Sequence, residues 1–141
     1  MTTEEALALS AKNGHSRCLF CGCLNPRSFN LRFSSDGDGV VKTQWKAESE
    51  LQGYEDILHG GVIAGLLDAA MTHCLFHHGV QAVTGELLVR FLQPVPCKAL
   101  LELRAWLVID RPPLYRTAAE MIYEQNIMAR AEAKFMRCPT L

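Results

Sequence analysis

The chain has 141 residues and a mass of 15.7 kDa, which is the size of one domain. Hydrophobic residues make up 49% and charged residues 21%, so the composition is that of a globular domain and excludes a disordered chain. Fourteen basic and fifteen acidic residues give a formal net charge of −1, and without a basic excess we expect no nucleic-acid partner.

The first 28 residues are expected to form a short helix followed by an irregular segment. Residues 3–13 are rich in Glu, Ala, Leu and Lys, which favour a helix, and Gly14 is suited to end it. Residues 15–28 contain three cysteines, Gly22 and an Asn-Pro pair, a composition that predicts turns.

Two strands are predicted next. Residues 29–33 are a short strand candidate, and residues 34–39 form a cluster of Ser, Asp and Gly that is typical of a turn. Apolar and polar residues alternate over residues 41–47, which indicates a half-buried strand. Residues 48–58 form a polar connection.

The following element is a helix that is apolar on nearly every side, which is typical of a helix buried all round. It opens with Gly60 and Gly61, continues through residues 62–71 and is expected to end near Gly79.

Four strands are predicted after this helix, separated by proline-containing or Gln-Asn turns: residues 82–92, 100–109, 115–124 and 127–137. The order predicts one α+β domain over residues 1–141, with about six mostly antiparallel strands curled around the helix. Since one layer of sheet covers only one side of a helix, we expect a second copy of the chain to cover the other side.

Membrane spanning and secretion are not expected. The longest strongly apolar stretch, residues 62–71, contains Asp68 and is far shorter than the ~20 residues that a bilayer needs. The acidic Glu4 and Glu5 stand where a signal peptide would be basic. A chain of this size builds a core without disulfides, so we expect its six cysteines to be reduced and its location to be cytoplasmic.

The start of the central helix carries the strongest functional signal. Gly60 and Gly61 leave the first N–H groups sterically open, and these donors, at the positive end of the helix dipole, suit an anion or a developing oxyanion. Asp68 lies mid-helix, where a buried carboxylate without a partner costs on the order of several kcal/mol, so it must meet a donor, water or a ligand. Each feature also has a purely structural interpretation: close packing for the glycines, a satisfied carboxylate for Asp68 and a helix cap for His59.

Together these residues resemble a known family. Residues 59–71, HGGVIAGLLDAAM, resemble the signature of hotdog-fold acyl-CoA thioesterases in the phenylacetate-pathway (PaaI-like) branch. Residues 18–26, CLFCGCLNP, resemble the cysteine-containing Asn-Pro opening of that branch, and residues 87–95, LLVRFLQPV, its strand after the helix. The resemblance covers about residues 18–96.

The resemblance implies an antiparallel sheet wrapped around one long helix, a homodimer or a dimer of dimers, and hydrolysis of an acyl-CoA substrate without a cofactor. By position, Asp68 matches the nucleophile or general base, and the N–H of Gly61 matches the donor to the thioester carbonyl. His59 matches the residue beside the carbonyl or the leaving sulfur, and Thr84 a hydroxyl that helps to hold the water.

Gly60, Arg90 and Arg116 are the expected substrate-binding residues, the two arginines as partners of the CoA phosphates. Each arginine has the alternative of simply facing solvent. Glu86, two residues after Thr84 and expected on the same strand face, is a second candidate acid or a solvated carboxylate.

The spacing of Gly61 and Asp68 predicts a shared site. The two lie seven residues apart on one helix face, separated by roughly 10 Å along the axis, so one carbonyl cannot contact both. Two antiparallel helices across a two-fold axis would bring Gly61 of one chain near Asp68 of the other. Direct attack by Asp68 and activation of a water both remain open.

Two other functions remain open. A non-catalytic module that binds acyl-CoA is one alternative, but it has no need of a buried carboxylate at the thioester. A hydratase or dehydratase on the same fold is another, although the chain shows no His-Asp pairing for proton movement at carbon.

A set of soft metal ligands follows the first helix: His15, Cys18, Cys21 and Cys23. Zinc accepts such ligands, but a compact cluster without a second, distant pair matches structural zinc sites incompletely. The alternative is a turn with buried thiols, and we therefore assign no metal site.

Overall fold

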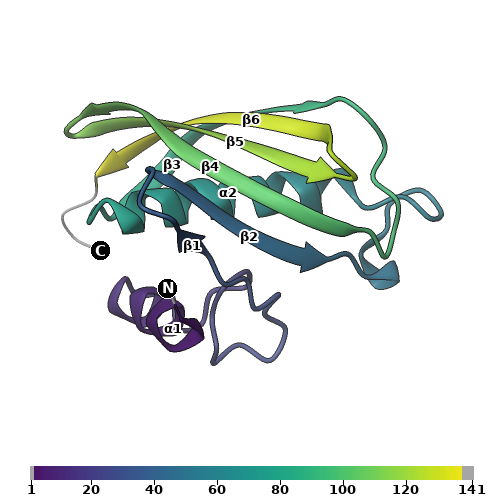
Figure 1. Cartoon of the computed structure of the whole chain (residues 1–141), viewed down its shortest axis with the longest axis horizontal. Coiled ribbons are helices and arrows are strands. Elements are labelled where there is room, and N and C mark those ends of the chain that lie inside the picture. The colour runs from purple at the N-terminus through teal and green to yellow at the C-terminus, as the bar shows by residue number, and fades with distance from the viewer. Residues whose placement is uncertain (1, 138–141) are drawn as a thin grey trace.

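The computed structural model describes residues 2–137. One six-stranded sheet arches over one long helix, α2 (Gly60–His77), with the strands in the order β1-β2-β4-β5-β6-β3 (Figure 1). Every pair of neighbouring strands is antiparallel. The predicted α+β architecture of about six strands around one helix is confirmed.

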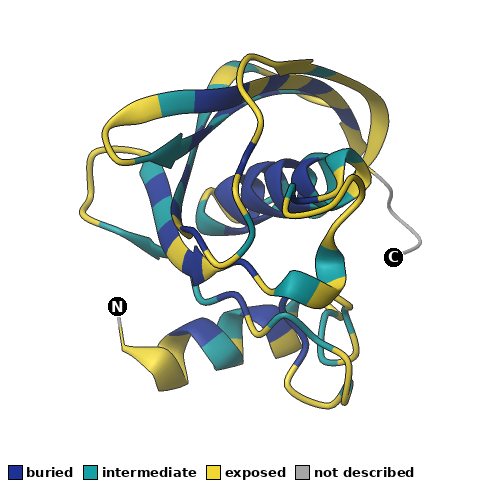
Figure 2. Ribbon diagram, turned by 90° about the vertical axis from the view of Figure 1, so that its right-hand side faces the viewer, coloured by how far each residue is buried: buried dark blue, intermediate teal, exposed yellow. Residues whose placement is uncertain are grey.

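The later strands lie where the alternation predicted them. The strands are β1 (Ser34–Ser35), β2 (Val40–Lys46), β3 (Ala82–Phe91), β4 (Leu100–Arg111), β5 (Leu114–Tyr123) and β6 (Asn126–Arg137). A 3-10 turn, Ser49–Leu51, interrupts the polar connection before α2. On the concave side of the sheet, alternate residues of β4, β5 and β6 are buried (Figure 2).

The prediction of a strand at residues 29–33 is wrong. Asn30 has a φ of 56°, which breaks the extended backbone, and the N–H of Leu31 donates to the carbonyl of Phe20 at 2.9 Å. The segment therefore pairs with the cysteine-containing loop instead of the sheet. The first strand of the sheet, β1, starts at Ser34, directly after this segment, in what was predicted to be a turn.

Both helices begin and end close to the predicted residues. Thr2 and Glu5 cap α1 (Thr3–Lys12) with a reciprocal pair of hydrogen bonds, and the chain leaves it through Gly14 at a φ of 76°. Neither helix of residues 2–137 has the length and hydropathy that a bilayer crossing requires.

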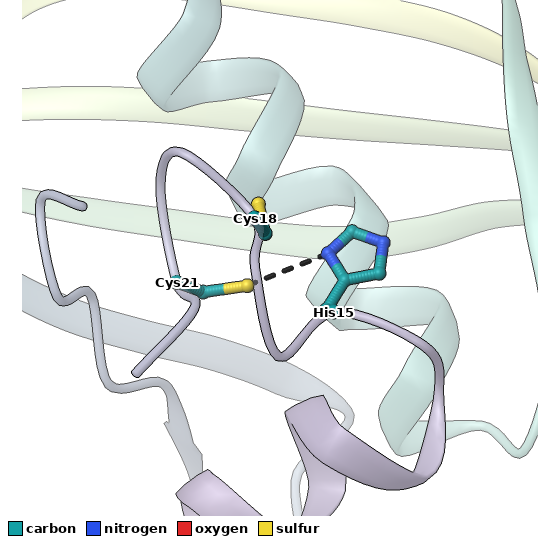
Figure 3. Close-up of side chains that lie close together, drawn as sticks. All are labelled: His15, Cys18 and Cys21. Carbon is teal, nitrogen blue, oxygen red and sulfur yellow. Dashed lines mark hydrogen bonds between the residues drawn. The ribbon is translucent and has the colours of Figure 1, made fainter. Parts of the chain in front are cut away.

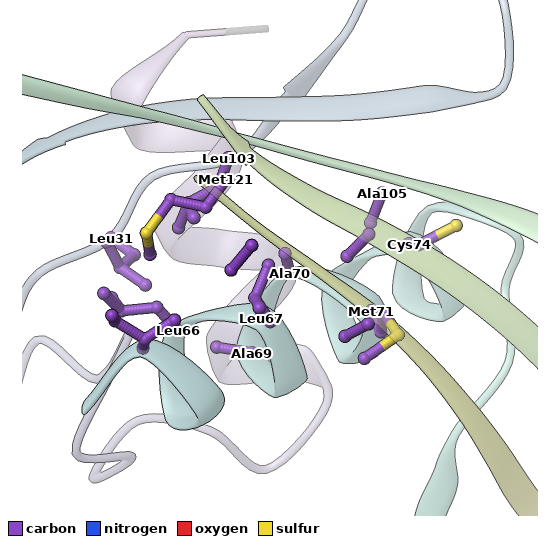
Figure 4. Packing of buried hydrophobic residues seen from close by; sticks show 14 of the residues in the cluster. Leu31, Leu66, Leu67, Ala69, Ala70, Met71, Cys74, Leu103, Ala105 and Met121 are labelled. Atoms are coloured by element: carbon purple, nitrogen blue, oxygen red, sulfur yellow. The ribbon is translucent and has the colours of Figure 1, made fainter. Parts of the chain in front are cut away.

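The core lies between α2 and the concave face of the sheet (Figure 4). Ten of the eighteen residues of α2 are buried. Their contacts in the cluster include Leu31, Leu103, Ala105 and Met121, and the side chains of Leu66 and Met71 have no exposed surface. A helix with so much apolar surface depends on this packing for its position.

The N-terminal segment covers the side of α2 that faces away from the sheet (Figures 1 and 2). The ring of Phe20 lies against Gly65 so closely that a Cβ there would stand 2.4 Å from Cζ. His15 packs edge-on against Phe76, with ring centroids 4.8 Å apart. The cover that the sequence assigned to a second copy is therefore supplied in part by the chain itself.

The strand β3 forms one edge of the sheet and is mostly exposed. Its apolar residues include Leu88, which is 52% exposed, and Phe91, which is 55% exposed. An unpaired edge with exposed apolar side chains is suited to pairing with another strand.

Candidate active site

Asp68 lies midway along α2 and is partly buried. Its Oδ1 accepts a hydrogen bond of 2.6 Å from Oγ1 of Thr84 on β3. Burial raises the pKa of the Asp68 carboxyl, whereas the hydrogen bond from Thr84 opposes this by lowering it. The carboxylate is thus satisfied by a side chain of another element, and it holds a proton more tightly than an exposed aspartate.

A bulge in β3 separates Thr84 from Glu86. Thr84 stands opposite the buried Phe135 and faces α2, while Glu86 stands opposite Lys134 and is exposed. The register shifts between the two, at Gly85, so that strict alternation fails. The expectation that Thr84 and Glu86 share a face is therefore wrong, and Glu86 forms an ion pair of 3.3 Å with Lys134 on the outer face.

A small cavity of about 70 Å³ lies beside Asp68. It is lined by α2 and by the N-terminal loop, through His15, Cys18, Phe20, Cys21, Asp68, Ala69, Thr72 and His73. The sequence reasoning missed this loop as part of the site. The signal was present in the crowded cysteines, but their proximity to Asp68 depends on the contact between Phe20 and Gly65.

The thiols of Cys18, which is partly buried, and Cys21, which is buried, lie beside Asp68 and differ in acidity. The hydrogen bond with the Cys21 side chain lowers the pKa of Cys18 to about 3. The same interaction, together with burial, raises the pKa of Cys21. Cys18 is therefore the more acidic thiol of the pair.

His59 caps the start of α2. Its Nδ1 accepts the N–H of Gly61 at 2.8 Å, so the donor predicted for a thioester carbonyl bonds to His59 in this conformation. A Cβ on Gly61 would lie 3.1 Å from the imidazole, and the ring itself is exposed. A side chain at Gly61 would therefore crowd the ring.

A larger cavity of about 680 Å³ opens at the same end of the helix. It is lined mainly by apolar residues, from Gly53, Tyr54, Ile57, Leu58, His59, Gly60, Ile63, Phe91, Leu92, Gln93, Pro94 and Val95. Its volume lies in the range of small-molecule sites, which are predominantly apolar with a few polar groups.

The predicted catalytic residues form two pairs in this chain. Asp68 meets Thr84, and His59 meets Gly61. Asp68 lines the smaller cavity, whereas His59 lines the larger one. The seven residues between Gly61 and Asp68 amount to roughly 10 Å of helix, so one protomer does not unite them.

Arg90 and Arg116 lie on the face of the sheet that points away from α2. Arg90 stands opposite Arg130, and the Arg116 guanidinium lies 4.0 Å from the Glu132 carboxylate. The structure does not bring either arginine to Asp68 within the protomer.

Residues 55–108, which contain α2, β3 and most of β4, match the family model described as the thioesterase superfamily. The match covers less than half of the chain. No curated protein sequence matches the chain.

Solved structures share the fold of this chain. A thioesterase superfamily protein, RHA08564, matches with a TM-score of 0.81 at 23% identity, over 86% of this chain and 63% of its own. This chain thus spans less than two-thirds of that relative. The PaaI protein of the E. coli phenylacetic acid degradation operon matches with a TM-score of 0.76 at 18% identity, over 94% and 96% of the two chains.

A third similar structure is smu.793 of Streptococcus mutans UA159 bound to acetyl CoA. It matches with a TM-score of 0.72 at 19% identity, over 77% of this chain and 89% of its own. At these identities the likeness concerns the fold, and the predicted hotdog fold is confirmed.

Proposed function

We propose that the protein hydrolyses an acyl-CoA thioester to the free acid and CoA, with Asp68 as the catalytic carboxylate. The observation that carries the proposal is Asp68 itself: a carboxylate of raised pKa, midway along an apolar helix, beside a cavity. It lies in the segment that matches the thioesterase superfamily. Perturbed carboxyls in clefts are typical of proton transfer and nucleophilic attack.

Two similar structures support a CoA ester as the class of substrate. One is the Streptococcus mutans protein bound to acetyl CoA, and the other is a hypothetical thioesterase of Streptococcus pneumoniae with coenzyme A. The 680 Å³ cavity beside His59 and Gly60 is apolar enough to take an acyl or pantetheine chain.

The proposed site is shared between two copies of the chain. Thr84 belongs to β3, so Asp68 lies at the exposed edge of the sheet. Pairing of two β3 strands would cover the apolar edge residues and continue the sheet across a two-fold axis. Asp68 of one copy would then approach Gly61 of the other.

In the proposed reaction the imidazole of His59 swings away from Gly61 and the thioester carbonyl takes its place. The Gly61 N–H then stabilises the developing oxyanion. Asp68, oriented by Thr84, either takes a proton from the attacking water or adds directly to the carbonyl carbon to give an anhydride that water cleaves. In both routes the carbon–sulfur bond breaks and CoA leaves as the thiolate.

One observation favours a different function, binding of acyl-CoA without catalysis. Nδ1 of His59 already accepts a hydrogen bond from the N–H of Gly61, the donor that the reaction needs. A module of this kind would bind CoA esters and leave the thioester intact, so hydrolysis itself discriminates the two functions.

The test is turnover of short, long and aromatic acyl-CoA substrates by the wild-type chain and by Asp68→Asn, with release of the CoA thiol as the readout. We expect Asp68→Asn to lose about a hundredfold or more in kcat with its circular dichroism unchanged. Asp110→Asn, an exposed aspartate at the end of β4, serves as the matched control and should retain full activity. Near-full hydrolysis by Asp68→Asn would overturn the assignment, and CoA binding without wild-type turnover would favour the binding module.

A further inference from the structure

Three ligand-bearing side chains converge in the segment that follows α1. Nδ1 of His15, Sγ of Cys18 and Sγ of Cys21 all lie within 4.8 Å of one another. The sulfur of Cys21 points toward the His15 ring and lies 3.4 Å from Nδ1 (Figure 3). In a tetrahedral zinc site with bonds of about 2.3 Å to sulfur and about 2.0 Å to nitrogen, these two atoms would be about 3.5 Å apart. His15 and Cys21 therefore already have the spacing of two ligands of one zinc ion, and Cys18 lies within reach of both.

A tight turn holds the two cysteines in place. The N–H of Gly22 donates to the carbonyl of Cys18 at 2.9 Å, and a Cβ on Gly22 would stand 2.4 Å from the Cys18 nitrogen. Only glycine fits there. The N–H of Phe20 donates to Sγ of Cys18 at 3.3 Å, a contact that suits a sulfur in its thiolate form. The turn thus keeps the two sulfurs within 4.8 Å of each other.

Neighbouring elements fix the rest of the cluster. The guanidinium of Arg32 donates to the carbonyl of Cys21 at 3.1 Å, and His15 packs edge-on against Phe76 of α2. Support of this kind sets the directions of the ligand atoms before a metal arrives.

We propose that His15, Cys18 and Cys21 bind one Zn²⁺ ion, with a fourth coordination position that opens to the 70 Å³ cavity lined by Asp68. Two thiolates and an imidazole in tetrahedral reach suit zinc and not the oxygen-seeking Mg²⁺ or Ca²⁺. Three protein ligands leave the fourth position to water or another small ligand. Cys23 is exposed and stands outside the cluster, so the four-residue set suggested by the sequence reduces to three.

The test measures metal and not hydrolysis. The full-length protein, purified under reducing conditions and dialysed against a weak chelator, is expected to hold about one zinc ion per chain by elemental analysis. Cys18→Ser, Cys21→Ser and His15→Gln should each weaken zinc binding by at least about tenfold. Loss of a residue that only orients a metal ligand already weakens binding by about that factor, and loss of the ligand itself should weaken it more. Cys23→Ser, in the same loop, is the matched control and should bind zinc as the wild type does.

A second measurement does not depend on the folding of the variants. The wild-type protein reconstituted with Co²⁺ should show thiolate-to-metal charge-transfer absorption and the strong visible bands of a tetrahedral site. Wild-type protein without zinc, absence of these bands, or a Cys18–Cys21 disulfide in the intact mass would overturn the proposal. Asp68→Asn should keep its zinc, since its carboxylate lies outside the cluster; loss of zinc there would contradict the open fourth position. The zinc proposal and the proposed hydrolysis can therefore be contradicted independently of each other.

Discussion

The hydroxyl of Thr84 on β3 donates a 2.6 Å hydrogen bond to the carboxylate of Asp68, sixteen residues earlier on α2. The bond ties the edge strand to the middle of the central helix. It also selects one orientation of the carboxylate, which makes Thr84 a positioning residue for the proposed reaction.

Thr84→Val is expected to lower kcat by about 10- to 100-fold, the equivalent of losing a hydrogen bond to a charged group. Because this bond lowers the pKa of Asp68, its loss should also move the acid limb of the pH–rate profile to higher pH. Thr84→Ser keeps the hydroxyl and should restore both properties. A merely structural threonine would leave the acid limb where it is in Thr84→Val.

Asp68→Asn is expected to raise the Tm at neutral pH. Burial raises the folded-state pKa of Asp68, so the folded chain binds the proton more tightly than the unfolded chain, whose pKa is about 3.9. As pH rises through the window between the two pKa values, the unfolding free energy of the wild type falls, and it stays lower above that window. Asparagine carries no charge, so the unfolding free energy of Asp68→Asn does not fall over this pH range. Its side-chain oxygen still accepts the hydrogen bond from Thr84.

Thermal unfolding across pH checks the sign. The advantage of Asp68→Asn should be largest near neutral pH and should shrink toward about pH 3, where the wild-type carboxyl is protonated in both states. An advantage independent of pH would show that the charge of Asp68 is not its cause.

The pattern of apolar and polar residues predicted the central helix and the strands that follow it. The sequence also identified Asp68 as a charged residue in an apolar helix. It missed the bulge at Gly85, because a single extra residue leaves no mark on an alternating pattern yet sends Glu86 to the opposite face. It also missed the loop at Asp68. That contact joins Phe20 to Gly65 across 45 positions of the chain, and no local pattern encodes such a distance.

Two substitutions at His59 distinguish a capping role of this residue from a catalytic role. His59→Ala removes the side-chain acceptor of the Gly61 N–H and should cost about 1 kcal/mol of stability, as loss of a cap does. His59→Asn supplies a good cap and should recover the Tm. If His59 also acts beside the carbonyl, as the resemblance implies, His59→Asn should remain low in kcat; full recovery of kcat would reduce His59 to a cap.

A mixed dimer tests whether the site is shared. One chain carries Asp68→Asn and the other carries Gly61→Val, whose side chain would strike the His59 ring. A site built from Asp68 of one copy and Gly61 of the other leaves one of the two sites intact, so the purified heterodimer should show about half of the wild-type rate per dimer. Each homodimer should be nearly inactive. A heterodimer as inactive as the homodimers would mean that each chain works alone.

Gly65→Ala tests the contact that brings the N-terminal loop to Asp68. Alanine inside a helix is normally more stable than glycine by about 1 kcal/mol. Here the new Cβ would stand 2.4 Å from Cζ of Phe20, and overpacking of this kind costs about 1–3 kcal/mol, so the net effect should be a loss of stability. Phe20→Leu shortens the side chain, and in that background Gly65→Ala should regain its helix preference and become stabilising. If chemical unfolding shows that Gly65→Ala destabilises the wild type and Phe20→Leu equally, Phe20 does not contact Gly65 in solution.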